Sequence, residues 1–224
     1  MIMTCLLGVL AGAVLWMDRV FLFQSMMSRP MIMGPLIGLV MGDLKAGLFV
    51  GVSLELLWLN SPPVGAYLPN DESFCAAIAV PVAVIAGSWA PHPSAAGLSI
   101  LLSLPGSIAG RILDTRLRTM NERIIVRGED AGEKEVPRAV GMALSRAFIM
   151  VLLLLGACIF FIGSIALYAG TILPEAAISA LSLVPFACMV IGIAALVSRE
   201  MPKKTHAGMF TLGLVLVLLL TWMI

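Results

Sequence analysis

Long apolar stretches separated by short polar breaks make up most of this 224-residue chain. A helix needs about 20 apolar residues to cross the hydrocarbon core of a bilayer. Six stretches approach that length. They are Met1 to Met17, Ser73 to Ala90, Ala96 to Gly110, Ala147 to Leu173, Pro174 to Val197 and Ala207 to Ile224. The stretch at the N-terminus lacks the basic start of a signal peptide, so we expect it to be retained as a membrane segment. The pattern predicts an all-α, polytopic membrane protein.

One further stretch, Arg29 to Glu72, is apolar but is broken where a spanning helix would be continuous. Pro30 to Gly42 holds thirteen residues without a charge, and Ala46 to Leu59 holds fourteen with a single charge. At about 1.5 Å per residue each piece reaches roughly 20 Å, less than the hydrocarbon core of about 30 Å. Interrupted segments of this kind are typical of solute sites in transporters, because irregular backbone at membrane depth must be buried or line a wet cavity. We expect broken or re-entrant half-helices at 30–59, followed by a loop at 60–72.

Glycines recur at every fourth position through both pieces. They are Gly34, Gly38 and Gly42 in the first piece, and Gly47 and Gly51 in the second. A helix with such a bare stripe lets the backbone of another helix approach closely. The stripe predicts close packing and says nothing about chemistry.

The composition agrees with a membrane protein. Hydrophobic residues make up 60% of the chain and charged residues 12%, and the mean hydropathy is +1.05. A soluble domain is far less apolar and carries about twice as much charge. At about 20 residues per span plus loops, the chain has room for roughly six or seven membrane-entering segments in a single domain, 1–224. The net charge of +1 and the absence of a basic, aromatic-rich patch argue against nucleic-acid binding.

No pattern of metal ligands, paired cysteines or catalytic side chains occurs in the sequence. The four cysteines stand singly in apolar segments, without the spacing of a metal or disulfide site. His92 lies in a turn between two prolines and His206 in a polar linker, and neither has a Ser, Cys or Asp placed as a catalytic partner. We expect no catalytic residue, no metal and no cofactor.

The basic residues orient the chain in the membrane. Eleven of the fourteen Lys and Arg residues lie in 111–146 and 199–204, which an even number of predicted spans separates. By the positive-inside rule both segments lie in the cytoplasm. We therefore divide the chain into a substrate-site half at 1–110, a cytoplasmic excursion at 111–140 and C-terminal spans at 141–224.

Polar residues in the first half indicate a solute site. Glu55 is costly within a membrane and normally faces a cavity or a partner, and Trp58 lies on the same helical face. The segment Asn60 to Glu72 combines prolines with adjacent acids and amides, so it cannot form a regular helix. Carboxylates and amides that bond to hydroxyls, beside an aromatic face for the ring, are the groups that bind a sugar.

Residues Asp18 to Ser28 mix charged and aromatic side chains. They fit an interfacial helix with an ordinary Asp18–Arg19 ion pair, and they fit a functional role for the two charges equally well. The sequence leaves this choice open.

The string RPMIMGPLIGLVMGDLKAGLFVGVSLELLWL, followed by PPVGAYLPNDE, resembles the membrane-embedded IIC subunit of the mannose/fructose/sorbose class of sugar phosphotransferase systems. Members carry an RP start, a PLVGL-like glycine stripe, a GDxKxG turn, a GxxLE helix and a GAxxPPDE-like loop, in this order. The resemblance is strongest over residues 15–87. Asn70 stands where the family commonly has a proline.

The resemblance implies a sugar-translocating subunit in the bacterial inner membrane, which binds a hexose-type sugar and delivers it for phosphorylation by a cytoplasmic IIB partner. It also implies a hetero-oligomer with a IID membrane subunit, cytoplasmic IIA and IIB phosphocarriers, and no covalent step by this chain itself. The family places a glutamine shortly before the RP start. Together with the polar groups above, this predicts the following substrate-binding residues: Gln24, Glu55, Asn60, Tyr67, Asn70, Asp71 and Glu72.

Two other functions also account for part of the pattern. An ion- or proton-coupled transporter of small solutes would place carboxylates at membrane depth too. A scaffold that serves only in assembly or sensing would keep the glycine stripes but would not need the polar residues of the first half.

Overall fold

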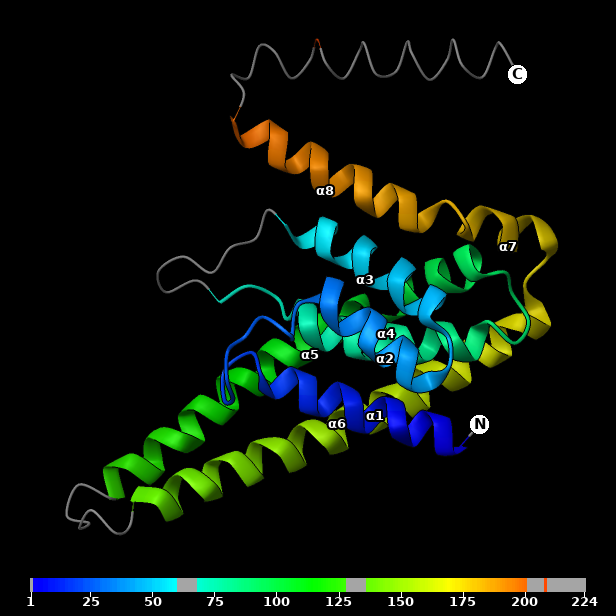
Figure 1. Ribbon diagram of the computed structural model, residues 1–224. Coiled ribbons are helices and arrows are strands. Elements are labelled where there is room, and N and C mark those ends of the chain that lie inside the picture. Colours follow the sequence, from blue (N-terminus) through cyan, green and yellow to red (C-terminus); the bar gives the residue numbers. More distant parts are fainter. Residues whose placement is uncertain (1, 60–67, 128–135, 201–207, 209–224) are drawn as a thin grey trace.

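The computed structural model describes residues 2–59, 68–127, 136–200 and 208. Every regular element in that part of the chain is an α-helix, as Figure 1 shows. The helices are α1 (Ile2–Met17), α2 (Pro30–Met41), α3 (Leu44–Trp58), α4 (Glu72–Ala86), α5 (His92–Arg127), α6 (Val136–Ile172), α7 (Glu175–Leu181) and α8 (Val184–Glu200). The predicted all-α class is confirmed. The last predicted stretch, Ala207 to Ile224, lies outside the described residues except for Gly208.

Helices α2 and α3 are the predicted pair of half-helices. Gly42 ends α2 in the left-handed backbone region, with φ at +85°, which glycine adopts without the steric penalty of a Cβ. Asp43 then caps α3 by accepting a hydrogen bond from the backbone nitrogen of Ala46. At 12 and 15 residues the two helices are roughly 18 and 22 Å long, so neither crosses the hydrocarbon core alone.

The glycine stripes of α2 and α3 pack against each other, as predicted. A Cβ added to Gly34 would lie 2.6 Å from the carbonyl oxygen of Gly47, and one added to Gly38 would lie 2.9 Å from the Cα of Gly47. A Cβ on Gly51 would lie 2.5 Å from the carbonyl oxygen of Pro30. Backbones approach this closely only where side chains are absent. The pair is therefore a tightly packed unit.

Helix α4 lies at the centre of the molecule. Its residues from Ser73 to Ala83 are buried, and it packs against α1, α2, α3, α5 and α6. Pro81 stands inside the helix without ending it. At 15 residues α4 is shorter than the predicted stretch Ser73 to Ala90. The missing residues are at its C-terminal end, whereas its first turn is buried together with the preceding Asp71.

Helices α5 and α6 are long, with 36 and 37 residues. Helix α5 continues through Arg111, where the sequence predicts a change from a membrane span to a soluble excursion. Figure 1 shows the end of α5 and the start of α6 running out together beyond the other helices. By length and composition, three described segments can cross a membrane: His92–Glu122, Val136–Ile172 and Glu175–Ser198.

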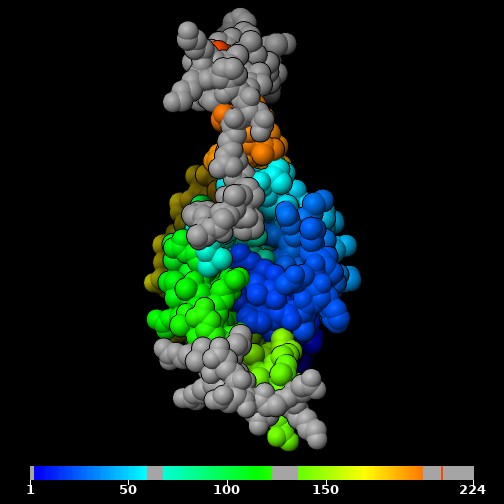
Figure 2. All heavy atoms as spheres, turned by 90° about the vertical axis from the view of Figure 1, so that its left-hand side faces the viewer, coloured from blue at the N-terminus to red at the C-terminus, as the bar shows by residue number. Residues whose placement is uncertain are grey.

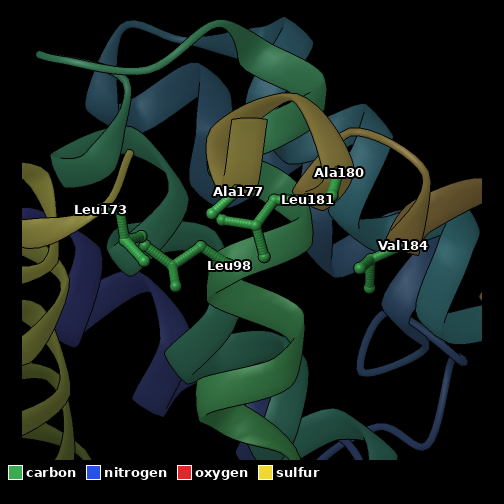
Figure 3. Close-up of a pocket in the computed structure, with 6 residues that line it drawn as sticks. All are labelled: Leu98, Leu173, Ala177, Ala180, Leu181 and Val184. Atoms are coloured by element: carbon green, nitrogen blue, oxygen red, sulfur yellow. The ribbon is translucent and has the colours of Figure 1, made fainter. Parts of the chain in front are cut away.

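The predicted span Pro174 to Val197 consists of two helices, α7 and α8, which meet at a short turn. Helix α8 packs on α3 and α5, and a Cβ added to Gly192 would overlap the carbonyl group of Leu56. An apolar cavity of about 310 Å³ lies beneath α7. Figure 3 shows its lining residues: Leu98, Leu173, Ala177, Ala180, Leu181 and Val184. The lining has no polar side chain, so this cavity does not suit a polar solute.

Candidate functional site

Charged side chains gather at one end of the bundle. The C-terminal ends of α1 and α3 and the N-terminal ends of α2 and α4 lie there together, as Figure 1 shows. Figure 2 looks onto this end, where the blue residues around the end of α1 lie beside the green residues of α5. Five residues, which we call the charged cluster, come from these helix ends and the loop after α1: Arg19, Arg29, Glu55, Asp71 and Glu72.

Asp71 is the fully buried member of the charged cluster. Its Oδ2 accepts a hydrogen bond of 2.8 Å from the indole Nε1 of Trp16, and its Oδ1 accepts one of 2.8 Å from the backbone nitrogen of Phe74. The guanidinium of Arg19 forms an ion pair with the same carboxylate. Both oxygens of Asp71 are therefore engaged, and an Asp at this position also caps α4.

Helix α5 closes over Asp71 from the other side. The backbone nitrogen of Asp71 donates a hydrogen bond of 3.0 Å to the carbonyl oxygen of Ser107. A Cβ added to Gly110 would lie 2.7 Å from the Cβ of Asp71, so only glycine leaves room for this approach. Asp71 thus ties the start of α4 to both α1 and α5.

The loop after α1 is organised by a second buried carboxylate, that of Asp18. It accepts hydrogen bonds from the backbone nitrogen and hydroxyl of Ser25, at 3.0 and 2.8 Å, and from the backbone nitrogen of Met27 at 2.8 Å. The interfacial helix with an Asp18–Arg19 pair is wrong, because residues 18–28 form turns and Arg19 pairs with Asp71 instead. The backbone prefers this arrangement because Asp18 satisfies several loop N–H groups at once.

Glu55 is held by the start of α2. Its Oε1 lies 2.8 Å from Nη1 of Arg29, and its Oε2 accepts a bond of 3.3 Å from the backbone nitrogen of Met31. Met31 lies in the first turn of α2, whose N–H groups have no partner within the helix. The Arg29 guanidinium is half exposed and also interacts electrostatically with Glu72. It therefore lies between two carboxylates that come from different helices.

Glu72 is the first residue of α4 and is half-buried. It interacts electrostatically with Arg19, Arg29 and Asp71. Asn70, directly before the cap, is also half-buried. These two half-buried residues flank the buried Asp71 in the sequence.

The structure brings together three of the seven predicted site residues, namely Glu55, Asp71 and Glu72, with Asn70 beside them. Gln24 is exposed, has a left-handed backbone with φ at +52°, and donates a hydrogen bond of 3.1 Å to the carbonyl oxygen of Val20 within its own loop. Asn60 and Tyr67 lie outside the described residues.

The predicted site residues did not include Trp16, Arg19 or Arg29, although the sequence left a functional role for Arg19 open. Arg19 and Arg29 carried a usable signal, since they are two of only three basic residues before residue 111. Trp16 carried none, because its bond to Asp71 joins residues 55 positions apart.

The chemistry of this end suits a neutral polar solute. Guanidinium groups donate hydrogen bonds and carboxylates accept them, so a molecule with several hydroxyls could bond to both kinds. Among the described residues, no group of three or more His, Cys, Asp or Glu is placed to hold a metal ion. A larger cavity of about 880 Å³ between α1 and α6 is lined mainly by apolar side chains such as Leu6, Leu10 and Phe160, and does not offer these groups.

Comparison with known proteins gives a family match over the whole chain. The family model described as the PTS system sorbose-specific IIC component matches residues 1–224. The mannose-specific EIIC component of Escherichia coli (strain K12) is 36% identical over 92 residues, which are 41% of this chain and 32% of the relative. The sorbose-specific EIIC component of Klebsiella pneumoniae is 38% identical over 92 residues, with the same shares. The chain spans about a third of the length of the curated relatives that it matches.

Two solved structures share the fold. A cryo-EM structure of the mannose transporter ManYZ in complex with microcin E492 matches 96% of this chain and 86% of that one, at 23% identity and a TM-score of 0.57. A structure described only as a membrane protein matches the same shares at 22% identity and a TM-score of 0.67. Both the family match and these neighbours point to one architecture.

Proposed function

The chain belongs to the sorbose-specific IIC family of the sugar phosphotransferase system, and on that premise we propose that it carries a hexose-type sugar across the bacterial inner membrane. Two relatives are named as permease components: a putative N-acetylgalactosamine permease IIC component of Escherichia coli (strain K12) and a fructose permease IIC component of Bacillus subtilis (strain 168). Its work is to bind the sugar and move it.

The charged cluster is the observation that carries this proposal. It lies where a pair of half-helices meets the first turn of α4, the kind of position at which transporters hold their solute. Glu72, Asn70 and Glu55 supply acceptors and donors for sugar hydroxyls, and the guanidinium groups of Arg19 and Arg29 supply donors. Such a site rejects analogues that lack a hydroxyl, because its buried polar groups would be left unpaired.

Asp71 has a different role within this site. Because both of its oxygens already accept bonds and the residue is fully buried, it acts as a positioning residue. It fixes Arg19 and the first turn of α4, and thereby aims Glu72. Glu72 then contacts the sugar directly.

The cellular setting follows from the family and from the charges. We propose a hetero-oligomer with a IID membrane subunit, served by cytoplasmic IIA and IIB phosphocarriers. Similarity to the ManYZ mannose transporter supports a membrane complex of this kind. The basic ends of α5 and α6 face the cytoplasm by the positive-inside rule, and the charged cluster lies toward the same side.

Sugar binding by the purified complex in nanodiscs tests the proposal. Glu72→Gln should weaken binding by about tenfold or more, since a hydrogen bond to a charged group contributes about 1.5 to 3 kcal/mol. Glu175→Gln, the same change at an exposed residue of α7, is the matched control and should bind normally. If Glu72→Gln binds sugar as tightly as the parent, Glu72 does not contact the sugar.

A proton-coupled transporter remains the second candidate, because a buried Asp71–Arg19 pair resembles the paired groups of proton pathways. The two functions differ in their products. A phosphotransferase subunit yields sugar phosphate inside the cell and needs its phosphocarriers. A proton-coupled transporter yields unmodified solute, and its uptake stops when the pH gradient is collapsed.

A further inference from the structure

The ends of α5 and α6 extend past the membrane as a paired projection. We call residues 112–127 of α5 and 136–146 of α6 the arm. At 36 residues α5 is about 54 Å long, whereas the hydrocarbon core is about 30 Å thick, so roughly 24 Å of helix lies outside it. Figure 1 shows both ends running out together beyond the other helices. Leu113, Asp114 and Leu117 of the arm are buried, whereas Arg116, Arg118 and Met120 of α5 and Val136, Arg138 and Val140 of α6 are exposed.

The surface of the arm alternates arginine with exposed apolar residues. On α6, Arg138, Met142 and Arg146 are spaced four apart and share one face, and 54% of Met142 is exposed. On α5, Arg116 and Met120 are also four apart, and both are exposed. Arginine and methionine are enriched at protein interfaces, so this pattern is typical of a docking surface.

The charges of the arm are available to a partner. Among the described residues, Arg116 and Arg138 form no ion pair, whereas Arg118 is engaged with Asp114 at 3.0 Å. Val136 and Val140 add two more apolar side chains, each more than half exposed. An acidic protein face with a small apolar centre complements this combination.

The length of the arm favours a protein over lipid as its binding partner. The apolar run of α6 begins after Arg146, so Val140 stands about 9 Å and Val136 about 15 Å beyond it along the helix. The headgroup layer on one side of a bilayer is only about 5 to 8 Å deep. The outer part of the arm thus lies past the reach of lipid, although Met142 does not.

The arm also begins at the charged cluster. Ser107 of α5 accepts a hydrogen bond from Asp71, and Gly110 packs on the same residue. Met120 follows Gly110 by ten residues, which is about 15 Å along the helix. A protein seated on the arm would lie over the cytoplasmic mouth of the site.

We propose that the arm is the docking surface for the cytoplasmic phosphocarrier that acts on the transported sugar, a soluble protein with acidic side chains around an apolar spot. This inference rests on the proposed function, and it assigns the partner to residues that the sugar site does not use. Docking there brings the phosphocarrier within reach of the sugar as it leaves the charged cluster.

Binding of the purified IIB phosphocarrier to the complete membrane complex in nanodiscs tests the proposal. Arg116→Glu combined with Arg138→Glu should weaken IIB binding at least about tenfold and flatten its dependence on salt, because exposed charges steer association. Met120→Ser combined with Met142→Ser should also weaken it. Lys45→Glu, an exposed reversal at the other end of the bundle, is the matched control and should change nothing. Sugar binding should stay normal in all three variants, which shows that they are folded.

Three outcomes would overturn the docking surface. The first is that both arm variants bind IIB as tightly as the parent complex does. If the parent complex still forms sugar phosphate, the proposed function stands and only the docking surface is wrong. Another is an effect of charge reversal seen only when phosphatidylglycerol is present in the discs, which would assign the arm to lipid. The third is failure of the parent complex to bind IIB or to yield sugar phosphate, which would contradict the proposed function as well.

Discussion

At the scale of single residues, the charged cluster separates a buried carboxylate from one at the edge of the bundle. Asp71 and Glu72 are adjacent in the sequence, yet Asp71 is enclosed by Trp16, Arg19 and Phe74 whereas Glu72 is half-buried. Adjacent residues at a helix start point in different directions, so one can cap the helix while the other faces outward. Their substitutions should consequently fail in different ways.

Trp16→Phe should lower stability while keeping most of the ring volume. The change removes the Nε1–H donor to Asp71, and a hydrogen bond to a charged group contributes about 1.5 to 3 kcal/mol. Thermal unfolding of the purified protein measures the loss. Trp89→Phe is the matched control, because the indole nitrogen of Trp89 is buried without a hydrogen-bond partner among the described residues, and its loss should cost little. Equal shifts in the two variants would argue against the Trp16–Asp71 bond.

Asp71→Asn and Arg19→Met should each destabilise the protein strongly, because each leaves a buried charge without its partner. Breaking such a pair typically costs about 3 to 5 kcal/mol. The double variant should cost much less than the sum of the two single changes, since neither charge is then left alone. Denaturant unfolding of all four proteins measures this coupling, and additive losses would show that the two residues act independently.

At the scale of elements, the half-helix pair depends on glycine at each crossing point. Helices α2 and α3 approach so closely that Gly47 lies against the backbone of both Gly34 and Gly38. In a membrane, where helices gain little from the hydrophobic effect on packing together, this contact area is a main source of association.

Gly47→Ala should reduce the amount of folded protein in the membrane, because the added Cβ would overlap the carbonyl group of Gly34. Membrane abundance and detergent-extracted monodisperse protein are the measurements. Gly141→Ala is the matched control, since nothing lies within 4 Å of a Cβ there and alanine favours the helix. Normal abundance of the Gly47 variant would mean that close packing of α2 on α3 is not needed for the protein to fold.

At the scale of the whole molecule, the arm and the turn between α4 and α5 lie at opposite ends. From the positive-inside rule we expect the arm in the cytoplasm and the turn outside. Nδ1 of His92 lies 3.4 Å from Oδ2 of Asp43, so the tip of the half-helix pair contacts this turn.

Thiol labelling tests this orientation. In a variant without the four native cysteines, Ser88→Cys should react with an impermeant thiol reagent applied to intact cells, whereas Thr119→Cys should react only after the cells are opened. Both positions are exposed, so access to each depends on its side of the membrane. The reverse pattern of labelling would invert the proposed topology.

Properties that depend on local pattern were predictable from the sequence. Apolar content and run length determined the membrane class, and the glycine period together with the Gly42–Asp43 break determined the half-helix pair. These properties follow from neighbours within one or two helical turns, which hydrophobic length and backbone preference govern directly. The acidic segment at the start of α4 was visible for the same reason.

Only the tertiary structure decided which charges meet. Asp18 and Arg19 are adjacent, but Asp18 bonds to its own loop while Arg19 reaches Asp71, and Glu55 pairs with Arg29 from 26 positions away. The sequence also did not predict that α5 continues through Arg111 and forms the arm. Charged residues become frequent after Arg111, which marks the end of the apolar run but not the end of the helix. Pairing of buried charges depends on which helix ends the packing brings together, because a charge inside the bundle takes the partner that packing places beside it, at whatever distance in the sequence.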